Sequence, residues 1–173
     1  LYVYGFSILV SILLLSSTEV TMMLAPETYQ ESIYCTIPLL VSAFFAAIYT
    51  LPSQVEYYYK KTQYISFGTL LATFLNIIMS LLLVPRYGYV SAAYINLFTY
   101  IIYFAFHYYF AYRIKKYNFL DAKAILISSL FCMAIAVYTR YFLDNIYLRW
   151  GLLLTMVIII FLYFFIERKS KLI

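Results

Sequence analysis

Six long runs without a charged residue divide this sequence, and they constrain its fold more than any other feature. A transmembrane helix needs about 20 consecutive, mostly apolar residues. The runs predict six transmembrane helices, near residues 1–18, 34–54, 63–84, 89–111, 123–143 and 149–166. A membrane β-barrel would instead show alternating segments of about 10 residues. We therefore expect an all-α membrane protein, with one transmembrane domain over residues 1–173.

The composition excludes several other classes of protein. Hydrophobic residues make up 66% of the chain and charged residues 11%, whereas a soluble domain is about 25% charged. Disorder requires low hydrophobicity and high charge, so it is excluded too. The net charge of +5 is not gathered into a basic stripe, and nucleic-acid binding is therefore not expected. Cys35 and Cys132 lie far apart and form neither a disulfide framework nor a metal site.

The cations are distributed unevenly between alternate loops. Nine of the 12 Lys and Arg residues fall in the loops 56–61 and 113–123 and in the C-terminal tail. They are Lys60, Lys61, Arg113, Lys115, Lys116, Lys123, Arg168, Lys169 and Lys171. The positive-inside rule places these segments, and hence the C-terminus, in the cytoplasm. Because the sequence opens on Leu1 without signal-peptide features, we expect it to be the C-terminal part of a longer protein.

Catalytic and ion-coupling motifs are not found. The sequence contains no phosphate-binding Gly-rich loop, no HExxH and no GxSxG, so we expect no enzyme, no cofactor and no metal site. The predicted outer loop 19–31 has neither Arg nor His, which disfavours a polysaccharide polymerase. No span carries a charge near its middle, as an ion-coupled carrier usually does. His107, the single histidine, is interpreted as an interfacial residue without a relay partner.

The polar residues inside the spans are uncharged. Asn76, Ser80, Asn96 and Thr99 are predicted to hydrogen-bond between helices, each worth about 0.6 kcal/mol. The alternative for Asn76 is that it lines a polar central cavity. Pro38 and Pro52 both fall in the second predicted span and predict two kinks there.

Several short motifs between residues 24 and 116 occur in an order that resembles one family. They are LAPETY at 24–29, YYYKKT at 57–62, Asn76, LVPRYG at 83–88, SAA at 91–93 and HYYFAYRIKK at 107–116. This order resembles the C-terminal part of the polysaccharide flippases, the Wzx-type O-antigen and capsule translocases of the MOP exporter superfamily. The chain departs from the family pattern at Ser80, where a second Asn is usual, and at Ser91, where Gly is usual.

The resemblance implies the C-terminal portion of a two-lobed, MOP/MATE-like helical bundle in the bacterial cytoplasmic (inner) membrane. It implies flipping of undecaprenyl-pyrophosphate-linked oligosaccharide repeat units for O-antigen or capsule synthesis. The implied partners are this lipid-linked oligosaccharide, the bilayer, the N-terminal lobe of the same protein, and polymerase and chain-length proteins. A MATE-like small-molecule exporter and a membrane polysaccharide polymerase are the alternatives.

Four residues are the candidate substrate contacts: Lys60, Lys61, Asn76 and Arg86. The pyrophosphate of such a substrate requires cationic partners, and the three cations flank the family-like spans. The alternative for Lys60 and Lys61 is that they anchor the topology on an anionic leaflet, worth about 1 kcal/mol each.

Overall fold

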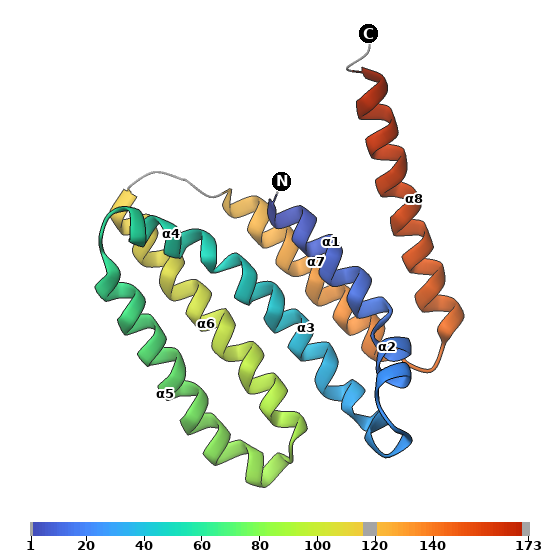
Figure 1. Cartoon of the computed structure of the whole chain (residues 1–173), viewed down its shortest axis with the longest axis horizontal. Coiled ribbons are helices and arrows are strands. Elements are labelled where there is room, and N and C mark those ends of the chain that lie inside the picture. The colour runs from blue at the N-terminus through green and yellow to red at the C-terminus, as the bar shows by residue number, and fades with distance from the viewer. Residues whose placement is uncertain (1, 116–120, 171–173) are drawn as a thin grey trace.

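The computed structural model describes residues 2–115 and 121–170, with side chains over 2–114 and 121–162. Within these ranges every regular element is a helix, which confirms the all-α prediction (Figure 1). The elements are α1 (Tyr2–Leu15), α2 (Ser17–Leu24), the 3-10 helix η1 (Glu27–Ser32), α3 (Ile33–Ile48), α4 (Thr50–Tyr58), α5 (Thr62–Tyr87), α6 (Val90–Lys115), α7 (Ala122–Tyr141) and α8 (Ile146–Ser170).

The described residues contain four or five candidate membrane spans. Four helical segments are long and apolar enough, namely Glu27–Tyr58, Thr62–Tyr87, Val90–Ile114 and Ala122–Tyr141. A fifth arises if α1 and α2, bent by 57° at their junction, count as one broken span. The sixth predicted span, 149–166, falls on α8, but its residues 163–166 lie outside those whose side chains are described. The chain is therefore compatible with a multi-pass membrane protein.

Some cations used for the topology also lie outside the described part of the chain. Lys116 and Lys171 belong to segments that the structure does not describe. The side chains of Lys115, Arg168 and Lys169 are likewise not described. The predicted cytoplasmic side of the C-terminal tail therefore stays a prediction.

The segment 19–31, predicted to be a loop, is mostly helical, as α2 and η1. The hydroxyls of Ser16 and Ser17 donate hydrogen bonds to the carbonyls of Ile12 and Leu14, at 2.9 and 2.7 Å. Such back-bonding by serine often bends helices. The helix therefore turns at Ser16 and continues to Leu24, past residue 18, where the first span was predicted to end.

The second predicted span, 34–54, lies within a longer helical segment. It runs over Glu27–Tyr58, with a change from α3 to α4 at Tyr49. Pro52 lies in the first turn of α4, where a missing backbone N–H removes little hydrogen bonding. Helix α3 continues through Pro38.

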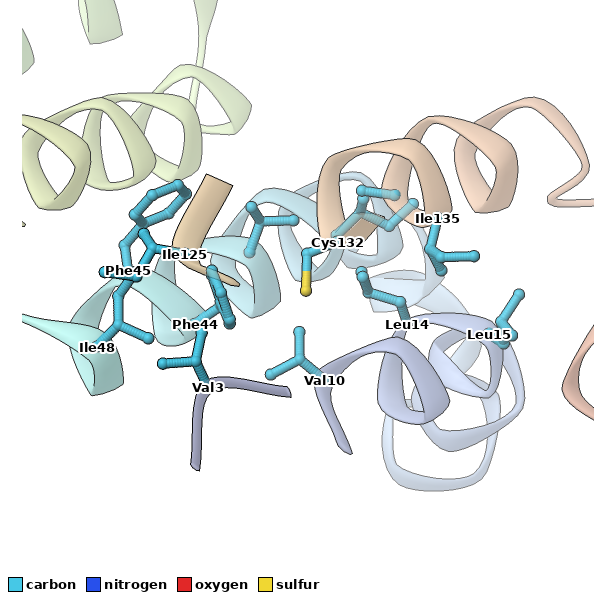
Figure 2. Packing of buried hydrophobic residues seen from close by; sticks show 13 residues of the cluster. Val3, Val10, Leu14, Leu15, Phe44, Phe45, Ile48, Ile125, Cys132 and Ile135 are labelled. Carbon is cyan, nitrogen blue, oxygen red and sulfur yellow. The ribbon is translucent and has the colours of Figure 1, made fainter. Parts of the chain in front are cut away.

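The hydrophobic core lies between α1, α3 and α7 (Figure 2). Val10 and Leu14 of α1 meet Phe44 of α3 and Cys132 of α7, and none of these side chains is more than 3% exposed. Helix α6 packs along the other side of α3, and α5 packs on α6 and on α4. Figure 1 accordingly shows α5 at the edge of the bundle, while α8 rises from the end of α7 and diverges from the other helices.

Candidate functional site

A polar hollow lies between α5, α6 and the junction of α3 with α4. Its volume is about 440 Å³. The lining residues are Tyr49, Thr69, Ala72, Thr73, Asn76, Ile77, Asn96, Thr99, Tyr100 and Tyr103. Every one of these except Ala72 and Ile77 carries a hydroxyl or an amide. In helices that are otherwise strongly apolar, this is a marked concentration of polar groups.

Helical spacing explains why these side chains face one another. On α5, Thr69, Thr73 and Asn76 are four and three residues apart, so they share one face of the helix. On α6, Asn96, Thr99 and Tyr103 follow the same kind of spacing. Because α5 packs along α6, the two polar faces meet and form opposite walls of the hollow.

Two hydrogen bonds connect the walls, and a third holds α6 to α3. The Thr69 and Tyr103 hydroxyl oxygens are 3.0 Å apart. The amide of Asn76 donates to the Thr99 hydroxyl at 3.4 Å. Behind them, the amide of Asn96 donates to Ser42 Oγ on α3 at 3.1 Å. These bonds fix the walls but leave further lone pairs and protons available to a ligand in the hollow.

Three tyrosine rings form the aromatic end of the polar hollow. The ring centroids of Tyr49 and Tyr103 are 4.6 Å apart, and Tyr100 lies 6.5 Å from Tyr49. Each ring offers an apolar face and a hydroxyl that exchanges hydrogen bonds. The hollow can therefore hold a ligand that is rich in hydroxyls and also has apolar C–H faces.

A buried ionisable pair lies directly behind these rings. His107 Nδ1 is 2.7 Å from Glu56 Oε2, and both side chains are 0% exposed. The imidazole centroid lies 4.5 Å from that of Tyr103 and 5.9 Å from that of Tyr49.

The sequence analysis was wrong about both members of this pair. It assigned Glu56 to a cytoplasmic loop and left His107 without a partner. Helix α4 instead extends to Tyr58 and turns Glu56 inward, on the same face as the buried Pro52 and Ser53. The signal in the sequence is weak, because it rests on Glu56 lying three and four residues after two inward-facing residues.

The structure brings only one of the four predicted contacts to the polar hollow. Asn76 lines it. Lys60 and Lys61 are exposed in the turn between α4 and α5, where Lys60 adopts a φ of +55°. Arg86 is exposed in the last turn of α5. At 1.5 Å per residue, it lies about 37 Å along the helix from Lys61.

Lys61 lines a second depression, which we call the cationic hollow. It has a volume of about 540 Å³ and holds two cations, Lys61 and Arg113. The remaining lining residues are Tyr59, Tyr64, Tyr109, Phe110 and Ile114. This depression lies at the end of α6 beyond His107, on the side that the cation distribution predicts to be cytoplasmic.

A second ion pair was also missed by sequence reasoning. Arg149 donates to both carboxylate oxygens of Glu19, at 2.6 and 2.9 Å, and to the carbonyl of Leu15 at 3.1 Å. The Leu15 carbonyl lies at the break between α1 and α2. The Arg149 guanidinium therefore connects the start of α8 to this break by hydrogen bonds. The pair has a structural role, and its members are too far apart in sequence for any local signal.

Comparison of the chain with protein-family models, with curated proteins and with solved structures finds no match. In the described ranges, no cluster of three or more His, Cys, Asp or Glu side chains could hold a metal ion. What can be said about function therefore depends on the chemistry of the two hollows and of the buried pair.

Proposed function

We propose that the chain is the C-terminal part of a transporter that flips lipid-linked oligosaccharide repeat units across the bacterial cytoplasmic membrane. The observation that supports this most is the polar hollow, whose walls carry amides, hydroxyls and three tyrosine rings. Polar groups at membrane depth cost several kcal/mol each when they are unsatisfied. A hollow lined in this way is best filled by water or by a polar ligand.

Sugar rings suit this lining. Their hydroxyls exchange hydrogen bonds with groups such as Asn76 and Thr73, and their C–H faces pack on tyrosine rings. The substrate would be an undecaprenyl-pyrophosphate-linked oligosaccharide. The cationic hollow supports this choice, because Lys61 and Arg113 together offer charge-assisted hydrogen bonds to a pyrophosphate.

A MATE-like small-molecule exporter is the second candidate, and the buried carboxylate of Glu56 favours it. Ionisable residues inside a membrane are costly and are retained mainly for function, above all in ion-coupled transport. An exporter of this kind would use the polar hollow for a small polar compound, and the cationic hollow would have no phosphate to bind.

The test is to delete the gene in the source organism and to determine which membrane leaflet holds the lipid-linked oligosaccharide. The flippase predicts accumulation in the cytoplasmic leaflet, relieved when the gene is restored. Single repeat units that reach the outer leaflet but fail to polymerise would indicate a polymerase. An unchanged sugar-lipid pool would contradict the flippase and favour the exporter.

A point variant sharpens this test. Asn76→Ala removes an amide from the wall of the polar hollow, and we expect it to lower flipping about tenfold, the equivalent of about 1.4 kcal/mol. Ser80→Ala is the matched control, because Ser80 is a polar residue of α5 that does not line the hollow. Equal flipping by the two variants would count against the hollow as the sugar path.

A further inference from the structure

The Glu56–His107 pair is completely buried, and each partner keeps one polar atom without a hydrogen bond. Glu56 Oε1 and His107 Nε2 have no partner among the residues that the structure describes. The other two atoms, Oε2 and Nδ1, are 2.7 Å apart. Unsatisfied buried polar atoms are rare in proteins, and each calls for a specific reason.

Among the described side chains, no third charged group forms an ion pair with either member. The titratable side chains against the imidazole are Tyr49, from the junction of α3 and α4, and Tyr103, from α6. Helix α5 contributes its backbone at Gly68, where a Cβ would lie 2.9 Å from His107 Nε2. The charged residues next along these elements are Lys60, Lys61 and Arg113, and all three are exposed.

The number of protons on the pair decides its net charge. A carboxylate beside a neutral imidazole carries one net negative charge, and a carboxylic acid beside an imidazolium carries one net positive charge. With one proton shared between them, the pair is neutral overall, either as an ion pair or as two uncharged groups. Burial disfavours an uncompensated charge strongly, so the closed environment favours the neutral state.

Release of the shared proton therefore requires water to reach the pair. Tyr49 and Tyr103 are the side chains between the pair and the polar hollow, since both line the hollow and both pack near the imidazole. Movement of these rings would admit water from the hollow to Glu56 Oε1 or His107 Nε2. The proton would then pass to water, and the carboxylate left behind would be hydrated.

We propose that Glu56 and His107 form a proton-binding site, which takes up and releases one proton as the polar hollow changes its hydration. This goes beyond the proposed transport, because the site is a property of the resting protein whatever fills the hollow. Only a proton is exchanged with water, and no other bond forms or breaks. With the proton bound the pair fastens α4 to α6, and after its release the buried carboxylate weakens that contact.

The chain offers an unusually direct test, because His107 is its single histidine. Isotopically labelled histidine, in protein purified without a histidine tag and reconstituted in liposomes, gives nitrogen NMR signals from this imidazole alone. Recorded between about pH 5 and 8, these signals report whether the imidazole gains or loses a proton. Glu56→Gln keeps an oxygen that accepts from Nδ1 but cannot hold the negative charge, so the midpoint should move by at least one pH unit, a tenfold change in proton affinity.

Glu27→Gln is the matched control, because it removes an exposed carboxylate that lies on η1. We expect it to leave the titration of His107 unchanged. Imidazole signals that stay constant over this pH range in the unmodified protein would overturn the proposal. An unshifted midpoint in Glu56→Gln would do the same.

Infrared spectroscopy of the unmodified protein keeps the proposal testable if Glu56→Gln fails to fold. If the neutral pair is two uncharged groups, the band of a buried protonated carboxyl should disappear as the pH rises, with the same midpoint as the imidazole signals. If it is an ion pair, the carboxylate band should shift at that midpoint instead. A carboxyl signal that does not change with the imidazole would overturn the shared site. No sugar is present in either measurement, so failure of the proton site and failure of the proposed transport can be told apart.

Discussion

Gly68 is the position where a single added methyl group should disturb the chain most specifically. It is the one buried residue of the long helix α5, and it lies against α6. An added Cβ would meet His107 Nε2 at 2.9 Å and Phe106 Cε1 at 2.9 Å. Real Cβ atoms essentially never approach other atoms this closely, so Gly68→Ala requires α5 or the two rings to move.

The magnitude follows from two opposing effects. Alanine favours a helix over glycine by about 0.5–1 kcal/mol. Overpacking of a well-packed site costs about 1–3 kcal/mol. The imidazole cannot turn away freely, because its Nδ1 is bound to Glu56 at 2.7 Å. We therefore place the overpacking cost near the top of its range and expect Gly68→Ala to destabilise by about 2 kcal/mol.

Thermal unfolding of the purified protein in detergent measures this effect. A loss of 2 kcal/mol corresponds to a fall in Tm of about 4–8 °C for a chain of this length. Gly151→Ala is the control, because it replaces another helical glycine whose added Cβ would have nothing within 4 Å. We expect that variant to raise Tm by about 1–4 °C through helix propensity alone. If Gly68→Ala raised Tm as much as Gly151→Ala does, the close packing of α5 on His107 would be refuted.

Three further predictions concern other contacts. Arg149→Gln removes the guanidinium that binds both carboxylate oxygens of Glu19, and it should lower the unfolding free energy by about 3 kcal/mol. This is at the low end for a buried ion pair, because Glu19 keeps 22% exposure. A loss as small as that of the exposed control Arg86→Gln would contradict the prediction. Asn96→Ala should lower the unfolding free energy by only about 0.6 kcal/mol, because single hydrogen bonds between membrane helices are weak. A loss above about 2 kcal/mol would be too large for the one bond from Asn96 to Ser42. A thiol reagent applied to the folded protein should leave Cys132 unlabelled, because its side chain is 0% exposed, and labelling before unfolding would contradict its burial.

The helical class and the approximate positions of the helices could be predicted from hydropathy alone. Apolar runs of sufficient length have few alternatives in a membrane, because each backbone group must find a partner inside its own helix. The break at Ser16 could not be predicted in this way, since serine hydroxyls that bond back to the helix leave the hydropathy almost unchanged. The predicted span 1–18 therefore did not anticipate that the helix bends at Ser16 and continues as α2 to Leu24.

The contents of the candidate site were harder to predict than the helices. Asn76 and Ser80 share a helical face by spacing, yet the structure groups Asn76 with Thr69 and Thr73. The Glu56–His107 pair joins residues 51 positions apart and depends on how α4 and α6 pack. Membrane helices are apolar on most faces, so their packing leaves little trace in the sequence pattern.

The edge position of α5 has a consequence for how this sequence can change over time. Most of the α5 surface touches no other part of the described chain, and Phe67, Leu70 and Leu81 are each more than 60% exposed. Within the described chain, no packing partner limits sequence change at such positions. At position 68, by contrast, any residue other than glycine would place its Cβ against the imidazole of His107. Among homologues, the outer face of α5 should therefore vary widely around one unchanging glycine.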